Sequence, residues 1–168
     1  MYPLITFHIL LVIISAFLCR LPFLKFPLDD DFAIYTYRAQ FANKGFRWKE
    51  DLQVIGIPVW KMILFDKLFS SSEKGHFRIR NLQTFFHAAA CISIYWLVLV
   101  ITQNPWAAFA GGILYSFYGT SPDLTAGSFN FEQFYIPFIF AGLAFLLNGS
   151  VFFSGLCFGF AAIAKYTM

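Results

Sequence analysis

Five apolar segments with the character of membrane helices constrain this chain more than any other feature of its sequence. The predicted spans are residues 3–19, 82–102, 105–119, 131–147 and 151–166. Inside a bilayer every backbone N–H and C=O must find its hydrogen bond within the protein, so such segments have to be helical. Composition agrees, because 59% of the residues are hydrophobic and 12% are charged, against about 45–50% and about 25% in a soluble domain. We therefore expect an all-α polytopic membrane protein with one transmembrane domain over residues 1–168.

Local signals mark where these helices begin and end. Asn104-Pro105 is a helix start signal, because Asn caps the first turn and Pro needs no N–H there. Asn148-Gly149 predicts a tight turn between the last two spans. Gly155 and Gly159 have the GxxxG spacing, which predicts close packing against another helix.

The histidines and cysteines inside the apolar segments predict packing roles. His8 and His87 have no polar partners near them in the sequence. Cys19, Cys91 and Cys157 lie in apolar runs without the spacing of a metal site. We expect all five side chains to pack within the bundle or against lipid.

The segment 20–81, between the first two spans, holds most of the charge. It contains eleven of the twelve Lys and Arg residues and seven of the nine acidic residues. Residues 32–44 and 58–69 are amphipathic, with apolar faces interrupted by charges, which predicts two helices lying at the membrane surface. This segment is therefore a long loop with interfacial helices and not a further span.

Three consecutive carboxylates, Asp29-Asp30-Asp31, form the most unusual polar feature of the loop. Like charges this close raise one another's pKa unless water, a cation or a substrate relieves them. One Asp would suffice as a helix N-cap, so three indicate a function beyond capping. A divalent cation on Asp30 and Asp31 is an alternative, because hard cations bind carboxylate oxygens. The register of the functional pair within the triplet stays open.

Counting the crossings places the charged residues on one face of the membrane. If the chain alternates direction, the triplet shares its face with Arg38, Arg78, Arg80, Asp123, Glu132 and Lys165. Charges at membrane depth are costly and usually functional. Acids and bases together suit a substrate with both hydroxyls and phosphate, because bases hold phosphate and a carboxylate accepts a proton.

The charge distribution gives conflicting information about which face this is. The positive-inside rule would place a loop rich in Lys and Arg in the cytoplasm. The loop 20–81 is long and nearly as acidic as it is basic, and under these conditions the rule weakens.

A series of motifs follows the order of a known family. An acidic pair after the first span precedes a Tyr, a helix ending in Gly, an aromatic and acidic loop, a Pro-led helix and Arg before the second span. An acid then opens a later span, and a Gly-rich span ends in Lys-aromatic. The residues are Asp30-Asp31, Tyr35, Gly45, Trp48, Glu50, Asp51, Pro58, Arg78, Arg80, Glu132 and Lys165-Tyr166. With them the chain resembles the N-terminal part of GT-C glycosyltransferases, especially the dolichyl-phosphate-mannose protein mannosyltransferase-like and aminoarabinose transferase-like groups.

This resemblance implies a reaction and a set of site residues. The reaction is inverting transfer of a hexosyl or pentosyl group from a polyprenyl-phosphate donor to an acceptor hydroxyl. Asp30 or Asp31 would be the general base. The resemblance assigns donor phosphate and sugar binding to Tyr35, Arg38, Lys61, Arg78, Arg80, Glu132 and Lys165. The family often has Lys-Pro-Pro where this chain has Gly56-Ile57-Pro58, so the usual Lys for the donor phosphate is missing. Lys61 is included because it would replace that Lys.

The resemblance also implies a location and partners. The protein would be integral to a membrane (the plasma or inner membrane in a bacterium), with the active-site loop outside the cytoplasm. Its partners would be the lipid bilayer, the polyprenyl-phosphate sugar and an acceptor of unknown class. We expect no nucleic-acid partner and no cofactor beyond the divalent cation considered above.

Two other classes of protein remain open at this stage. A transporter or flippase half would fit intramembrane charges and a helix broken at Pro137. A non-catalytic assembly subunit or inactive fragment is the other, because GT-C bundles have many more spans than five. On that ground we expect the chain to be an N-terminal fragment that is inactive alone.

Overall fold

The computed structural model describes residues 2–25, 73–121 and 132–164, and these parts of the chain are helical and contain no strand. The elements are α1 (Tyr2–Arg20), the short 3₁₀ helix η1 (Leu21–Lys25), α5 (Glu73–Thr102), α6 (Pro105–Tyr118), α7 (Glu132–Leu147) and α8 (Val151–Ala164). The all-α prediction is therefore confirmed for the described residues.

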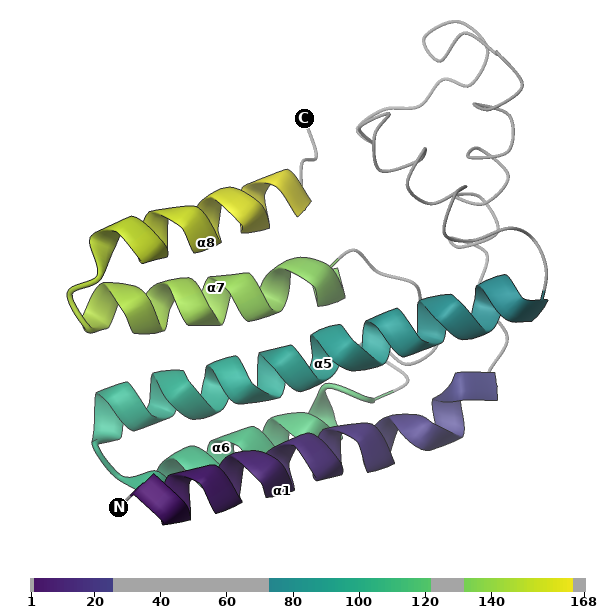
Figure 1. Cartoon of the computed structure of the whole chain (residues 1–168), viewed down its shortest axis with the longest axis horizontal. Coiled ribbons are helices and arrows are strands. Elements are labelled where there is room, and N and C mark those ends of the chain that lie inside the picture. Colours follow the sequence, from purple (N-terminus) through teal and green to yellow (C-terminus); the bar gives the residue numbers. More distant parts are fainter. Residues whose placement is uncertain (1, 26–72, 122–131, 165–168) are drawn as a thin grey trace, which may run out of the picture.

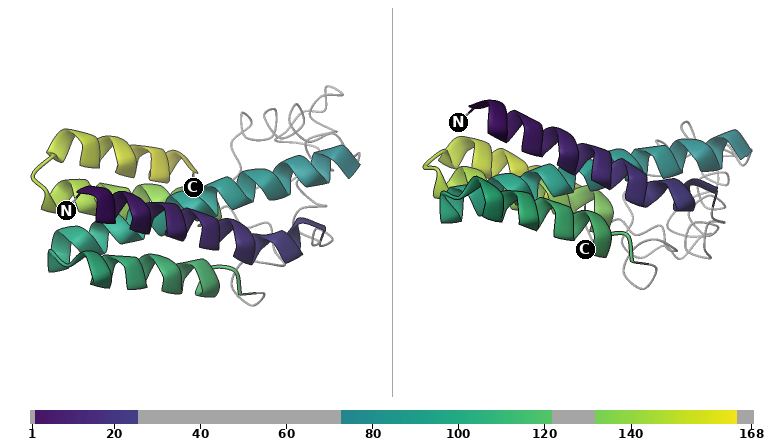
Figure 2. Two further views of the ribbon diagram at one scale, coloured as in Figure 1. Left: turned by 60° about the horizontal axis from the view of Figure 1, so that its bottom comes forward. Right: turned by 90° about the horizontal axis from the view of Figure 1, so that it is seen from below.

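The helices form a layered bundle around the long helix α5 (Figures 1 and 2). α7 packs on one side of α5, while α1 and α6 pack on the other side and also contact each other. α8 lies outside α7 and packs mainly against it. Successive helices alternate in direction, so the C-terminal ends of α1, α6 and α8 lie at the same end of the bundle as the N-terminal ends of α5 and α7 (Figure 1).

Two segments differ from their sequence-based descriptions. The predicted loop 20–81 contains the first turns of α5, because this helix begins at Glu73 and not at residue 82. Hydropathy marks only the apolar part of a helix, and the polar residues from Glu73 to Arg80 continue it past that part. Pro22 and Pro27 predict extended backbone from Leu21 to Leu28. Its described part, Leu21–Lys25, is instead a 3₁₀ helix, because a proline near the start is compatible with a helical φ.

The predicted helix ends at two turns are confirmed. The Asn104 side chain accepts a hydrogen bond from the backbone N–H of Trp106 at 2.9 Å, so it caps α6. Gly149 has φ +78°, a left-handed conformation that favours glycine. The backbone N–H of Ser150 then donates to the carbonyl of Phe145 at 2.8 Å and closes α7.

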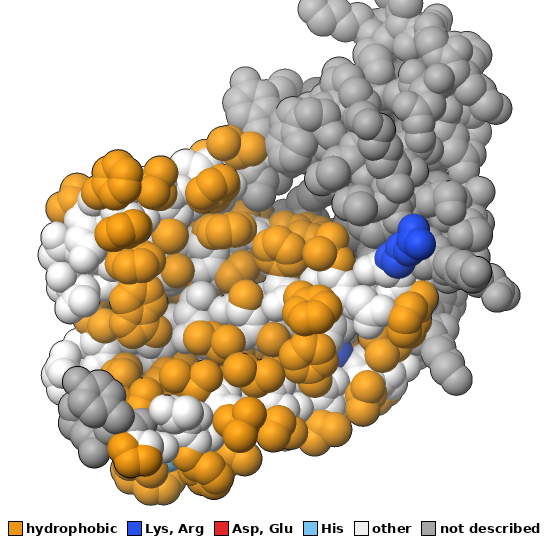
Figure 3. All heavy atoms as spheres, viewed as in Figure 1, with side chains coloured by type: hydrophobic (Ala, Val, Ile, Leu, Met, Phe, Trp, Pro, Cys, Tyr) orange, Lys and Arg blue, Asp and Glu red, His pale blue; other side chains and the backbone are white. Residues whose placement is uncertain are grey.

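Two described segments, Pro3–Leu24 and Arg80–Thr102, are long and apolar enough to cross a membrane. Gln133–Leu147 and Val151–Ile163 are shorter apolar helices. Apolar side chains cover most of the face seen in Figure 3, and the Lys and Arg side chains visible there lie towards one end. An apolar surface of this extent is compatible with a lipid environment.

The core between α1, α5 and α6 is built largely from small side chains. Its buried residues are Val12, Ala16, Ala88, Cys91, Tyr95 and Ala108. α6 approaches α1 closely at Gly112, where an added Cβ would lie 3.0 Å from Cγ2 of Val12. The close approach of these two helices therefore depends on the missing side chain at Gly112.

Replacing Gly112 with Leu is expected to destabilise the bundle by roughly 1–3 kcal/mol, because the larger side chain must displace Val12. Thermal unfolding of the purified protein in detergent measures the change. Gly155→Leu is the matched control, because nothing lies within 4 Å of a Cβ added there. Equal unfolding temperatures for Gly112→Leu and the unmodified protein would contradict this account of the α1–α6 contact.

The GxxxG motif of α8 does not make the predicted close contact within the described residues. A Cβ added at Gly155 or Gly159 would meet nothing within 4 Å. The close contact between α7 and α8 is instead at Gly142, where an added Cβ would lie 3.2 Å from Cβ of Cys157. Spacing identifies a face of small residues, but only the packing decides which face of a helix meets its neighbour.

Candidate functional site

Most of the predicted site residues lie outside the part of the chain that the structure describes. These are Asp30, Asp31, Tyr35, Arg38, Lys61 and Lys165, together with the predicted helices 32–44 and 58–69. Glu132 is the first residue of α7. The structure describes the side chains of Arg78 and Arg80, which have opposite surroundings. Arg78 is exposed, whereas Arg80 is 1% exposed.

A second arginine, Arg20, is buried at the same end of the bundle. Its side chain is 2% exposed, and it belongs to a stripe of α1 at every fourth residue, His8, Val12, Ala16 and Arg20, that faces the interior. In the sequence, Arg20 only marks the end of the first predicted span. The helix is apolar on all sides, so its sequence contains no signal that distinguishes the buried face.

Each buried arginine donates a hydrogen bond to a buried glutamine. The partner of Arg20 lies on another helix, and the partner of Arg80 lies in the next turn of the same helix. Nη2 of Arg20 lies 3.5 Å from Oε1 of Gln133, a long contact between α1 and α7. Nη1 of Arg80 donates to Oε1 of Gln83 at 3.1 Å within α5. The acceptor is a neutral amide oxygen in both cases, so neither hydrogen bond neutralises a guanidinium. We call Arg20, Arg80, Gln83 and Gln133 the arginine–glutamine cluster.

The charges of the cluster are close to each other. The guanidinium groups of Arg20 and Arg80 are near enough to repel one another. Bringing two like charges out of water is costly, and a hydrogen bond to a neutral amide supplies no opposite charge. Ionisable groups buried among apolar helices usually mark a functional site.

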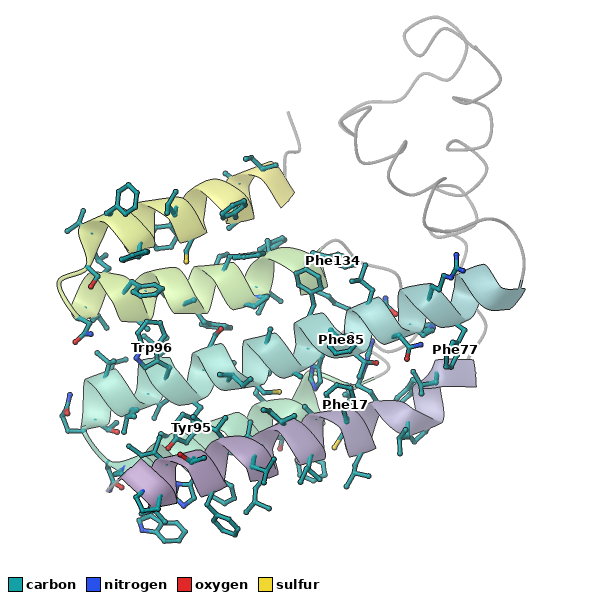
Figure 4. The ribbon with its side chains drawn as sticks, viewed as in Figure 1. Phe17, Phe77, Phe85, Tyr95, Trp96 and Phe134 are labelled. Carbon is teal, nitrogen blue, oxygen red and sulfur yellow. The ribbon has the colours of Figure 1, made fainter. Side chains whose placement is uncertain are left out.

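Aromatic side chains pack between the helices on the side of the bundle nearer this end and lower its local polarity. Phe17 and Phe85 make an edge contact between α1 and α5, with ring centroids 5.6 Å apart. Phe86 and Phe134 make another between α5 and α7 at 4.8 Å. Figure 4 shows Phe17, Phe85 and Phe134 projecting from three different helices at the half of the bundle nearer this end. Electrostatic attraction between a guanidinium and an anion is stronger in such surroundings than in water.

The next layer of polar side chains is satisfied within the fold. Ser15 and Ser116 share a hydroxyl–hydroxyl hydrogen bond of 2.7 Å between α1 and α6. The Thr84 hydroxyl donates to the carbonyl of Arg80 at 2.8 Å. Nε2 of His87 lies 3.2 Å from the carbonyl oxygen of Ser116, which can only accept, so we assign the proton to this nitrogen. The expectation that His87 lacks a polar partner is thus wrong, and this layer is structural.

The opposite end of the α1–α5–α6 unit carries an apolar cluster. His8 is 1% exposed and its ring lies 4.7 Å from the rings of Trp106 and of Phe109, measured between centroids. Tyr95 contacts the same ring edge-on at 6.4 Å. The packing role predicted for His8 is therefore confirmed, and charged side chains of the described helices gather only at the other end.

The described residues contain no group of three or more His, Cys, Asp or Glu side chains that could hold a metal ion. The predicted cation site on Asp30 and Asp31 falls in the segment 26–72, outside these residues. The arginine–glutamine cluster itself offers mainly N–H donors. Its chemistry therefore suits an oxyanion, such as phosphate, and not a cation.

Comparison with protein-family models, curated proteins and solved structures found no match to this chain. The function of the chain is therefore inferred from its own residues. The two strongest observations are the buried arginine pair and the acidic triplet that follows Arg20 in the sequence.

Proposed function

We propose that this protein is an integral-membrane glycosyltransferase. It moves a hexosyl or pentosyl group, with inversion, from a polyprenyl-phosphate donor to an acceptor hydroxyl. The observation that carries the proposal is the burial of Arg20 and Arg80, which influence each other electrostatically, at one end of an apolar bundle. A lipid-linked phosphate is an anion whose oxygens two guanidinium groups can bind.

The acidic triplet is tethered to the same end. Asp30 follows Lys25, the last residue of η1, by five residues, and such a segment spans at most roughly 18 Å when fully extended. The segment returns to the bundle at the start of α5, two turns before Arg80. The length of the linker is therefore compatible with one site that contains both the carboxylates and the buried guanidinium groups.

The proposed reaction uses these two kinds of group for different steps. The carboxylate of Asp30 or Asp31 accepts the proton of the acceptor hydroxyl, whose oxygen attacks the anomeric carbon from the face opposite the phosphate. The bond between the anomeric carbon and the phosphate oxygen breaks, and its electron pair leaves with the lipid phosphate. Arg20 and Arg80 stabilise the negative charge that develops there. Tyr35, Arg38, Lys61, Arg78, Glu132 and Lys165 complete the proposed donor site.

We also propose that all five apolar helices cross the membrane. α6, α7 and α8 contain 14, 16 and 14 residues, fewer than the roughly 20 that a typical span needs. Their packing beside the longer helices and a locally thinner bilayer would accommodate this length. The arginine–glutamine cluster then lies at the extracytoplasmic face.

Cysteine labelling tests this topology. In a background in which Cys19, Cys91 and Cys157 are replaced, a cysteine at Ser72 is expected to react with a membrane-impermeant reagent on intact cells. A cysteine at Gln103, in the turn at the opposite end of α5, is expected to react only after permeabilisation. Reaction of the Ser72 position only after permeabilisation would place the loop in the cytoplasm and contradict the proposal.

A direct assay tests the function itself. The full-length protein in nanodiscs is incubated with a polyprenyl-phosphate hexose or pentose and a panel of acceptors: Ser/Thr peptides, lipids and glycans. The proposal expects release of polyprenyl phosphate and formation of a glycosylated acceptor. A nucleotide-sugar donor is the control and should give no product. Failure of every lipid-linked donor, or product from the nucleotide sugar alone, would refute the proposal.

A further inference from the structure

The side-chain amide nitrogen of Gln83 is buried and donates no hydrogen bond to any group of the described bundle. Its side chain is 0% exposed, and Oε1 accepts the hydrogen bond from Nη1 of Arg80. Nε2 is buried and has no hydrogen-bond partner among the described residues. Buried amide donors are normally satisfied, so an exception at a cluster of charges indicates a ligand.

The hydrogen bond from Arg80 determines which atom of the Gln83 side-chain amide remains without a partner. A guanidinium has only donors, so the oxygen of Gln83 must face it and the NH₂ group must point elsewhere. Arg80 and Gln83 are three residues apart and share a face of α5. That face also carries Thr84 and His87, whose side chains turn inward and are hydrogen-bonded. The unused donors of Gln83 thus lie in the interior beside the arginine pair.

We propose that Gln83 binds phosphate directly, donating from Nε2 to a non-bridging oxygen of a phosphate group held by Arg20 and Arg80. The site then combines two guanidinium groups with a neutral amide donor, and Gln83 both orients Arg80 and contacts the ligand. The identity of this ligand as a lipid-linked phosphate rests on the proposed function, whereas recognition of phosphate oxygens does not.

Gln83→Glu separates these two roles of the side chain. Glu keeps the oxygen that accepts from Arg80 and strengthens that contact with a charge, so a merely structural role is preserved. It loses both N–H donors and places a negative charge against the ligand. A purely structural Gln83 therefore predicts unchanged binding, and a ligand-binding Gln83 predicts its loss.

The measurement is the affinity of the full-length protein in phosphatidylcholine nanodiscs for polyprenyl phosphate and, separately, for inorganic phosphate. In Gln83→Glu the affinity for polyprenyl phosphate is expected to fall by about tenfold or more, while the unfolding temperature is unchanged or raised. An equal loss for inorganic phosphate assigns the site to the phosphate group alone. A loss confined to the lipid assigns it to the lipid headgroup. Wild-type affinity for both probes in Gln83→Glu would overturn the proposal.

Two further variants complete the experiment. Gln103→Glu makes the same substitution at the exposed opposite end of α5 and should bind as the unmodified protein does. Gln83→Met also removes both N–H donors and replaces Gln83→Glu in the experiment if that variant does not fold. Unchanged affinity of Gln83→Met for both probes would again overturn the proposal. Binding that depends on Gln83 in a protein that transfers no sugar would refute the glycosyltransferase and leave the phosphate site standing.

Discussion

Asp30→Asn and Asp31→Asn are expected to separate into one nearly inactive variant and one active variant. Asn has the shape of Asp but cannot accept the proton of the acceptor hydroxyl at neutral pH. Loss of a general base typically costs about 10²–10⁴-fold in rate. We therefore expect kcat for sugar transfer to fall by that factor in the variant that lacks the base, with KM for the lipid donor changed less. The pair of measurements also resolves the register of Asp29-Asp30-Asp31.

Asp29→Asn is the matched control for this experiment, because Asp29 is expected to be a solvated neighbour and its loss should change kcat less than threefold or so. Full transfer activity in both Asp30→Asn and Asp31→Asn would show that neither carboxylate is the general base. A divalent cation on the carboxylates makes a different prediction, because chelation would then abolish activity in the unmodified protein.

Arg20→Met is expected to abolish most activity without destabilising the protein. Replacing a buried ionic group by an apolar side chain of similar volume is often neutral or stabilising, because its desolvation cost disappears. The leaving phosphate loses one of its two buried guanidinium partners, and removal of one such charge-stabilising group typically costs about 10²–10³-fold in kcat. Thermal unfolding and transfer kinetics of the same preparation measure the two effects together.

Two related variants sharpen this result. Arg20→Lys keeps the charge but loses the planar fork of donors, so an intermediate activity is expected. Arg78→Met removes an exposed arginine of α5, where water screens the charge, and should have the smaller effect. A marked drop in unfolding temperature with retained activity in Arg20→Met would show that Arg20 is structural.

Local sequence signals were sufficient for the helical class and for two of the helix ends. Apolar content predicted the helical character of the described segments, and the cap at Asn104 and the turn at Gly149 were legible from two residues each. Their physics involves only neighbouring backbone groups. The start of α5 was missed because its first turns are polar, and hydropathy contains no information about a helix that continues beyond its apolar part.

The candidate site was predictable in part. Arg80 was identified from its place before the second span, and counting crossings correctly brought the N-terminal end of α5 to the same end as the C-terminal end of α1 (Figure 1). The sequence could not show that Arg78 is exposed and Arg80 is buried, because the two residues lie only two positions apart in the same polar stretch. Gln83 and Gln133 were not recognised, because a glutamine in an apolar helix has no distinctive pattern until its partner is known.

The sequence by itself determined the helical class, the turns at Asn104 and Gly149, and the concentration of charge near one end of the bundle. These features follow from composition and from contacts between near neighbours. Only the tertiary structure decided that Arg20 is buried with Arg80, that Gln133 reaches Arg20 across 113 positions of sequence, and that the GxxxG face of α8 is left open. Each depends on which face of a helix meets which neighbour, and that is settled by the packing of the whole bundle.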